Sequence, residues 1–227
     1  MSRRATITID GPGGSGKSTI ARLLAQRLGF SFLDSGAIYR AATWFALDRG
    51  VDLAVNCDVI RALDDMELEL VQGPSGMLVF VNSVDVTSQI RTRHVSNSIY
   101  HLAGSRQVRD RLIGVQRSFA EAGSLVAEGR DMGTVVFPEA ALKFYLDASL
   151  EVRAQRRQEE LSRSGESVPL ESLIEEIRKR DERDMNRAVA PLRRPDGAVF
   201  VDSSRMSILE VVDLMKAEAI ARELALC

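Results

Sequence analysis

Short apolar runs alternate with longer segments of helical periodicity along most of the chain. The pattern predicts buried strands at residues 5–9, 32–34, 125–127, 143–147 and 198–202. It predicts helices at residues 17–28, 37–49, 105–122, 149–163, 170–188 and 207–225. Gly29 and Gly50 follow the first two helices, as glycine commonly does at a helix C-terminus. Strands that alternate with helices predict an α/β fold, with a parallel sheet covered by helices on both faces.

One region breaks this alternation and predicts an inserted subdomain. Two β-rich runs, 67–71 and 77–81, flank the turn-forming sequence Gln-Gly-Pro-Ser-Gly, which is typical of a β-hairpin. We therefore expect a mainly antiparallel subdomain at residues 65–103. The core domain would then consist of residues 1–64 and 104–227.

Composition and charge exclude several classes of protein. The formal net charge of −2 over 227 residues lacks the excess of Lys and Arg that a general nucleic-acid binder needs. Cys57 and Cys227 are the two cysteines, and their spacing fits neither a metal site nor a disulfide framework, which indicates a reducing compartment. Asp10 interrupts the first apolar run, and no stretch approaches membrane-spanning length. We expect a cytoplasmic protein with no membrane and no nucleic-acid partner.

The sequence GPGGSGKST, directly after the first predicted strand, fits two glycine patterns. One is G-x-G-x-x-G, which binds dinucleotides, and Asp34 lies about 20 residues further on, where an acid would bind the ribose. The other is G-x-x-x-x-G-K-[ST], which binds nucleotide phosphates. The glycines alone therefore do not decide between the two chemistries.

Lys17 and Ser18 favour the phosphate loop, because a dinucleotide site gives these two side chains no role. In a phosphate loop the backbone N–H groups surround the phosphates of ATP, Lys17 reaches the β- and γ-phosphates, and the Ser18 hydroxyl binds Mg²⁺. We predict that the ATP site comprises Gly11, Pro12, Gly13, Gly14, Ser15, Gly16, Lys17, Ser18 and Thr19. Lys17 is the predicted catalytic residue of this loop.

Two further polar stretches follow strands, at the sheet edge where open α/β folds bind ligands. In the first, Ser35 is a candidate helix N-cap and Arg40 a candidate ligand of a second anion. In the second, Glu128 occupies the position of an acid that approaches Mg²⁺, and Arg130 and Asp131 follow it. We expect these charged groups beside the phosphates.

The densest charge lies on two arginine-rich helices. Arg180, Asp184 and Arg187 share one helix face, although charge ladders of this kind are usually solvated surface. Arg153, Arg156 and Arg157 recur with similar spacing on the preceding helix. We predict a lid at residues 155–168 whose neighbouring arginines close over phosphates.

These stretches together resemble bacterial cytidylate kinases, of the nucleoside monophosphate kinase family. The resemblance covers nearly the whole chain and includes the blocks 11–19, 33–40, 128–133, 146–149 and 180–192. It implies a phosphate-loop NTPase-type core with a five-stranded parallel sheet, a monophosphate-binding insert and a short lid. It also implies transfer of the γ-phosphoryl group of Mg-ATP to CMP or dCMP, giving ADP and CDP or dCDP.

The resemblance also implies which residues bind the acceptor nucleotide. By position, the family pattern assigns Ser35, Arg109 and Asp131 to the cytosine base. The same pattern assigns Arg40 and Arg130 to the phosphate of CMP.

The remaining family positions concern the sugar and the phosphates. Arg180 and Asp184 would hold the sugar hydroxyls, and Arg187 would lie near the phosphates. The chain departs from the pattern at Tyr100, where the family uses a serine near the base, and at Glu128, where the family often has Asp.

Phosphoryl transfer requires positioning and charge neutralisation, with no general base. We expect Lys17, Arg153, Arg157 and Arg187 to stabilise the transition state together with Mg²⁺ bound by Ser18 and Glu128. Two rival functions remain open, namely a phosphate-loop kinase for another small acceptor, and a nucleotide switch that hydrolyses ATP slowly. A second set of anion-binding arginines favours a kinase, acting as a monomer on the small molecules CMP and dCMP.

Overall fold

The computed structural model describes residues 4–73, 76–163 and 165–224. Predictions that concern the centre of the hairpin turn (74–75), residue 164 of the lid, residue 225 of the last helix and Cys227 lie outside the described residues. Contacts divide the chain into a larger unit, Met1–Phe30 with Ser124–Cys227, and a smaller unit, Ser31–Gly123. The predicted insert falls within the smaller unit, and the two units are described separately below.

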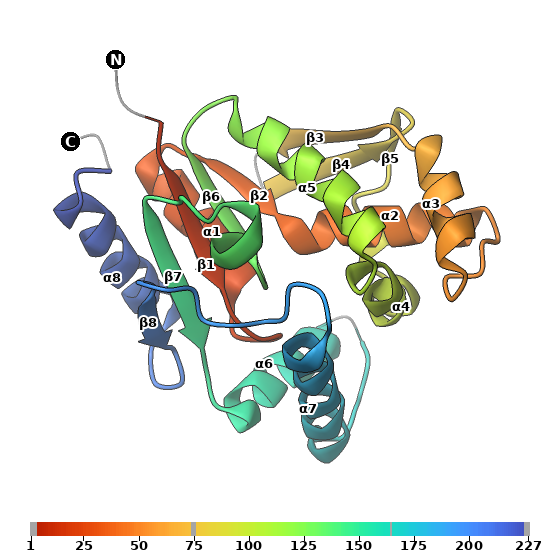
Figure 1. Ribbon diagram of the computed structural model, residues 1–227. Helices are drawn as coiled ribbons and strands as arrows, with labels where there is room; N and C mark the ends of the chain where they lie inside the picture. Colours follow the sequence, from red (N-terminus) through yellow and green to blue (C-terminus); the bar gives the residue numbers. More distant parts are fainter. Residues whose placement is uncertain (1–3, 74–75, 164, 225–227) are drawn as a thin grey trace. The chain divides into compact units, whose positions relative to one another are not determined.

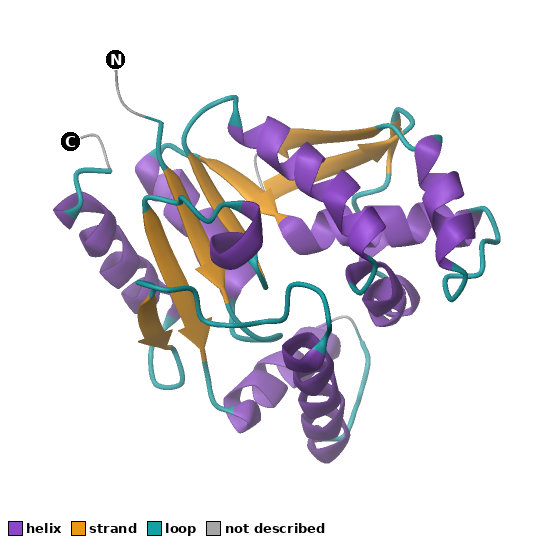
Figure 2. Cartoon of the chain, in the orientation of Figure 1, coloured by secondary structure: helices purple, strands orange, loops and turns teal. Residues whose placement is uncertain are grey.

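The sheet of the larger unit is parallel. Five strands form a sheet in the order β2-β6-β1-β7-β8, of which the last four belong to the larger unit (Figure 1, Figure 2). The pairs β1–β6, β1–β7 and β7–β8 are all parallel. The elements of this unit are β1 (Thr6–Asp10), α1 (Lys17–Leu28), β6 (Leu125–Gly129), η2 (Met132–Val136), β7 (Leu142–Asp147), α6 (Leu150–Arg163), α7 (Leu170–Asn186), β8 (Val199–Asp202) and α8 (Ile208–Ala221).

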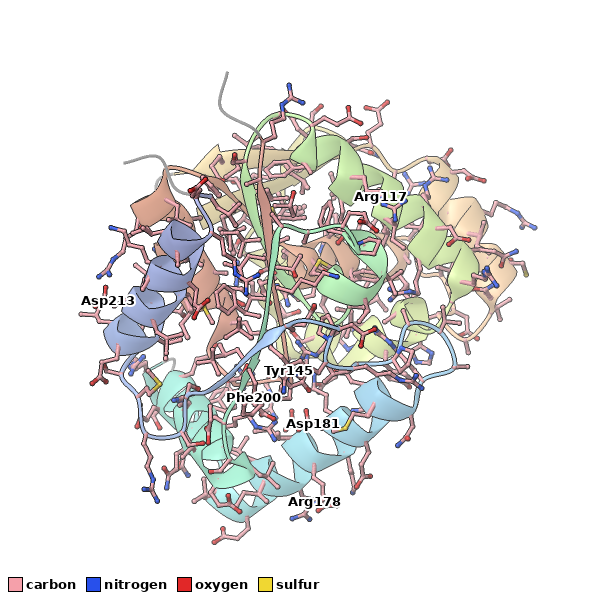
Figure 3. The ribbon with its side chains drawn as sticks, turned by 60° about the vertical axis from the view of Figure 1, so that its left-hand side comes forward. Arg117, Tyr145, Arg178, Asp181, Phe200 and Asp213 are labelled. Atoms are coloured by element: carbon pink, nitrogen blue, oxygen red, sulfur yellow. The ribbon has the colours of Figure 1, made fainter. Side chains whose placement is uncertain are left out.

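The two faces of this sheet are covered differently. Helices α1 and α8 contact each other, and α1 packs on β6, whereas the π-helical turn η2 packs on β1 and β6 from the opposite face (Figure 1). Strand residues such as Ile7, Ile9 and Phe144 are fully buried between these layers. On the outer strands Tyr145 and Phe200 stack with ring centroids 6.3 Å apart (Figure 3). The central strands therefore form the core that holds the loops at their ends.

Helices α6 and α7 form a pair at the carboxyl ends of the strands (Figure 1). A small apolar cluster joins them, made of Ala154 and Leu161 from α6 with Leu173 and Ile177 from α7. The remaining surface of both helices is mostly charged, and exposed pairs such as Arg178–Glu175 lie on it. The arginine-rich segment of the sequence thus contributes both a packed face and a solvated face.

The smaller unit contains a separate antiparallel sheet. Strands β3 and β4 form the predicted hairpin, and β5 pairs with β4, also antiparallel. The elements are β2 (Ser31–Asp34), α2 (Ser35–Asp48), α3 (Asn56–Asp64), β3 (Leu68–Gly73), β4 (Gly76–Val81), β5 (Val84–Asp85), η1 (Gln89–Arg91), α4 (Arg93–Ala103) and α5 (Arg106–Ala120). Helices α3 and α4 are additions that the sequence analysis missed.

The predicted fold class is confirmed: a five-stranded parallel sheet with flanking helices, and a separate small antiparallel sheet. Helix α1 has the predicted bounds, and the other predicted helices differ by a few residues at their ends. Among residues 4–73, 76–163 and 165–224, no helix is both long and apolar enough to cross a lipid bilayer.

Candidate functional site

The loop between β1 and α1 has a shape that only glycine permits at its first position. Gly11 has φ of +153°, and a Cβ there would lie 2.0 Å from the backbone oxygen of Leu146 on β7. The loop therefore turns directly against the end of β7 and leads into α1, which begins at Lys17. Free backbone N–H groups at a helix N-terminus favour an anion, so this end of α1 is suited to phosphate.

The Lys17 ammonium lies folded over this loop. Its Nζ donates to the backbone oxygen of Pro12 at 2.6 Å and to Ser15 Oγ at 3.4 Å, and Ser15 Oγ also donates to the Pro12 oxygen at 3.1 Å. Burial, reinforced by the positive charge of Arg130, lowers the pKa of Lys17 to about 7. A bound polyphosphate would supply negative charge that compensates this buried ammonium.

Ser18 and Glu128, the two predicted metal ligands, lie side by side. Ser18 Oγ donates to Glu128 Oε1 at 2.6 Å, which joins the first turn of α1 to the end of β6. A hydroxyl and a carboxylate fit Mg²⁺, which prefers oxygen ligands and takes the rest of its shell from water and substrate phosphates. The described residues contain no group of three or more His, Cys, Asp or Glu side chains that could hold a metal ion.

Two of the predicted acceptor arginines flank the phosphate loop. A Cβ placed on Gly13 would lie 3.4 Å from Arg130 Nη2 and 3.7 Å from Arg180 Cδ and Nε. Arg130 Nε donates to Asp184 Oδ2 at 2.9 Å. Burial alone would raise the pKa of Asp184, but Arg130 and Arg180 lower it overall. A second cluster of positive charge therefore adjoins the loop that Lys17 occupies.

Asp131 is buried beside Arg187. The Arg187 Nη2 atom lies 3.5 Å from Asp131 Oδ1, and Arg187 Nε donates to the backbone oxygen of Ala190 at 2.5 Å. Only 3% of Asp131 is exposed. Arg187 follows the last residue of α7, so the charged face predicted for that helix does turn toward the site instead of being wholly solvated.

The arginines of α6 divide into buried and exposed positions. Arg153 donates to the backbone oxygen of Gly13 at 3.1 Å and pairs with Asp181 of α7 at 2.5 Å. Arg157, by contrast, is about one-third exposed and pairs with Glu160 on its own helix. The structure thus ties Arg153 to the phosphate loop and leaves Arg157 at the surface.

The smaller unit holds the other acceptor candidates. Asp34 caps α2 by accepting from the Ala37 N–H at 2.8 Å, so the suggestion that Ser35 is the N-cap is wrong; Ser35 is the first helical residue. The second carboxylate oxygen of Asp34, Oδ2, pairs with Arg40 at 3.0 Å. Asp34 is therefore engaged within α2, which removes the acid that the dinucleotide interpretation required.

Arg109, from α5, is almost completely buried. It is 2% exposed, its guanidinium lies 5.6 Å from the centre of the Tyr39 ring, and Nη1 lies 3.5 Å from the backbone oxygen of Ala103. Tyr100, at the position where the resemblance expects a serine, is 46% exposed and packs against His101. A buried arginine is costly unless its charge is compensated, and here the Ala103 oxygen and the face of the Tyr39 ring lie beside the guanidinium.

Comparison with known proteins decides the family. The family model described as Cytidylate kinase matches residues 7–221. Proteins named cytidylate kinase are 47% identical in Stutzerimonas stutzeri (strain A1501), with 96% of each chain covered, and 43% identical in Streptococcus gordonii (strain Challis), with 96% of this chain and 97% of that protein covered. The chain belongs to the cytidylate kinase family. The resemblance inferred from the sequence motifs is thereby confirmed.

One solved structure supports the fold of this cytidylate kinase family member independently of sequence. An uncharacterized protein from Eubacterium ventriosum ATCC 27560 superimposes with a TM-score of 0.54 at 11% identity, covering 96% of this chain and 99% of that one. At such low identity the likeness concerns the fold alone. The kinase assignment rests on the family match and on the site.

The analysis of the sequence did not predict Asp10 as a residue of the site, and it placed Arg156 only among the lid arginines. Asp10 ends β1, is fully buried and accepts two backbone N–H groups from the loop after β6, while burial raises its pKa to about 7. Arg156 donates to the backbone oxygen of Ser15 at 3.2 Å and to that of Ser203 at 2.7 Å. For Asp10 the available signal was an acid directly before the glycine loop. The spacing on α6 did indicate Arg156, but not its bond to the phosphate loop.

Proposed function

We propose that this chain transfers the γ-phosphoryl group of ATP to CMP or dCMP. The observation that carries this proposal is the second positive cluster, Arg130 and Arg180, beside the Gly13 turn of a phosphate loop. A donor needs one anion site and a nucleoside monophosphate needs another, whereas a switch needs only the first. Membership of the cytidylate kinase family supports cytosine as the acceptor base.

The donor half of the mechanism belongs to the phosphate loop. Backbone N–H groups of Gly11–Thr19 and the Lys17 ammonium would bind the β- and γ-phosphates, and the ammonium would neutralise charge on the group in transfer. Ser18 and Glu128 would hold Mg²⁺, which supplies further positive charge to the phosphate oxygens. Arg153, tied to the Gly13 backbone, would keep the loop in shape, and Arg157 would reach the phosphates only when the lid closes.

The acceptor half would use the residues that the family pattern assigns to CMP. Ser35, Arg109 and Asp131 would bind the cytosine, and all three side chains are buried, so mismatched groups could not be compensated by water. Arg40 and Arg130 would bind the CMP phosphate.

The remaining charged groups of α7 complete the acceptor site. Arg180 and Asp184 would hold the sugar hydroxyls, and Arg187 would lie near the phosphates. Because Asp184 also pairs with Arg130, loss of the 2′-hydroxyl would leave the Asp184 carboxylate with a partner, which supports dCMP as an acceptor. We propose that the enzyme works as a cytoplasmic monomer.

A panel of acceptors tests the proposed function. Purified protein with Mg-ATP should release ADP in a coupled assay when CMP or dCMP is added, at least about a hundredfold faster than with AMP, since a mispaired buried base costs several kcal/mol. ATP hydrolysis without an acceptor should be slow. Fast hydrolysis without acceptor, or AMP used as well as CMP, would contradict the proposal.

The lowered pKa of Lys17 predicts a proton linkage to donor binding. Before nucleotide binds, the pKa of Lys17 is about 7, so most of the side chain is deprotonated at pH 8. The negative charge of bound phosphates would raise this pKa again. Mg-ADP binding at pH 8 should then take up close to one proton, and affinity should fall as pH rises above about 7. Calorimetry in buffers of different ionisation enthalpy measures this uptake.

The control for this linkage is Lys17→Met, which lacks the ammonium but keeps the length of the side chain. It should lose most of the proton uptake. Asp10, buried at the end of β1 directly before this loop, also has a pKa raised to about 7 by burial. Unchanged uptake in Lys17→Met would show that a group other than Lys17, such as Asp10, takes up the proton.

A further inference from the structure

We propose that Asp10 is a positioning residue for the acceptor nucleotide. It fixes the positions of Arg130 and Asp131 through the backbone of the loop that carries them. The inference rests on the proposed function, in which those two side chains bind CMP. Asp10 itself would touch neither nucleotide.

Both oxygens of the Asp10 carboxylate are used on this loop. Oδ1 accepts from the Met132 N–H at 2.8 Å, and Oδ2 accepts from the Gly133 N–H at 2.7 Å. Asp10 is fully buried at the end of β1, so no water replaces either bond. Two bonds from one rigid carboxylate to successive amides fix the direction of the chain just after Arg130 and Asp131.

Gly133 is the residue that lets the loop come this close. A Cβ at that position would lie 3.2 Å from Asp10 Oδ2, 2.9 Å from Thr8 Oγ1 and 2.9 Å from Pro195 Cγ. Any larger residue would push the N–H away from the carboxylate. Asp10 and Gly133 therefore act as a matched pair that seats the acceptor loop on the central strand.

The position of Asp10 in the chain links the two nucleotide sites. The next residue, Gly11, begins the donor loop, where its backbone lies against Leu146 of β7. The same strand end thus fixes where the donor loop begins and where the acceptor loop turns. In-line transfer depends on the distance between these two loops, so a small displacement of either would lower the rate.

A carboxylate is required here because the two N–H groups need two acceptors. Asparagine offers one carbonyl oxygen and would direct its NH₂ group at the other N–H, leaving that donor unsatisfied. Asp10→Asn should therefore displace the loop while changing the side-chain volume very little.

The test compares Asp10→Asn with the parent enzyme in full kinetics. We expect kcat/KM for CMP to fall roughly tenfold to a hundredfold, the CMP over UMP preference to shrink, and KM for ATP to stay within about twofold. The matched control is Asp202→Asn, which changes a strand-end carboxylate that accepts the Ser204 N–H on the exposed end of β8. This control should leave all three values unchanged.

A double-mutant cycle separates positioning from a general loss of stability. In the Arg130→Ala background, Asp10→Asn should cost less in kcat/KM for CMP than it does in the parent enzyme, because one of the two residues through which it acts is gone. Gly133→Ala should reproduce the kinetic pattern of Asp10→Asn and serves as the test if Asp10→Asn does not fold. If the effects of Asp10→Asn and Arg130→Ala on kcat/KM are fully additive, or if kcat/KM falls equally for ATP and CMP, this inference is overturned while the proposed function stands. If Arg130→Ala leaves the CMP kinetics unchanged, the proposed acceptor site fails as well.

Discussion

Lys17→Ala is expected to lower kcat/KM for the reaction of ATP with CMP by about a hundredfold to a thousandfold. The Lys17 ammonium is buried in the phosphate loop, where a preorganised charge stabilises a transition state by about 3–4 kcal/mol. The loss should fall mainly on kcat, because the charge of the moving phosphoryl group is greatest in the transition state. Steady-state kinetics with both substrates varied measures this division.

The fold should survive this change. Ser15 Oγ still donates to the Pro12 oxygen when the Lys17 ammonium is removed, so the carbonyl keeps a partner. Circular dichroism and thermal unfolding check that the variant is native. Lys179→Ala, which removes an ammonium from the exposed face of α7, is the control and should keep parent activity. A folded Lys17→Ala protein with near-normal turnover would refute the phosphate-loop assignment.

The second large effect is discrimination between CMP and UMP. Cytosine presents an amino donor at N4 beside an acceptor at N3, whereas uracil presents an acceptor and a donor at these positions. In the proposed site the Asp131 carboxylate accepts from N4 and the Arg109 guanidinium donates to N3. With UMP both would face like-kind groups, at about 1–3 kcal/mol each, or on the order of a thousandfold in kcat/KM.

Asp131→Asn tests this account of base selection, because its amide can donate to O4 of uracil. We expect kcat/KM for CMP to fall and that for UMP to rise relative to it, so that the ratio drops by at least about tenfold. Arg187 lies 3.5 Å from Asp131 and loses the negative charge of its partner in this variant, so thermal stability must be measured as well. A parent enzyme that uses UMP as well as CMP, or an unchanged ratio in Asp131→Asn, would disprove the assignment.

The predictable parts of this protein are those that depend on neighbours in the sequence. The bounds of α1 follow from Gly16 before it and Gly29 after it, and the β3–β4 hairpin follows from its turn residues. The pairing of Ser18 with Glu128 was also foreseeable, since both positions follow parallel strands whose ends meet at one edge. Local patterns and sheet geometry were sufficient for these features.

The features that sequence analysis missed depend on contacts between distant residues. Asp10 ends an apolar run and marks the end of a strand; its bonds to Met132 and Gly133 join residues more than a hundred positions apart. Helix α4 did have a local signal, since Thr92 caps it, but the hairpin pattern beside it dominated the interpretation. Nor can spacing on α6 tell that Arg153 is buried against Asp181 while Arg157 stays near solvent.

Two arginines of α6 also set a mechanical limit on lid movement. Arg153 holds the backbone oxygen of Gly13, and Arg156, one turn later, holds that of Ser15. The first half of α6 is thus anchored to the phosphate loop at two carbonyls and cannot swing without breaking both bonds. We therefore expect the hinge of the predicted lid to lie beyond Arg156, so that the distal half of α6 moves when the lid closes. Helix α7 pairs with Arg153 through Asp181 and with Arg130 through Asp184, and is expected to stay with the phosphate loop.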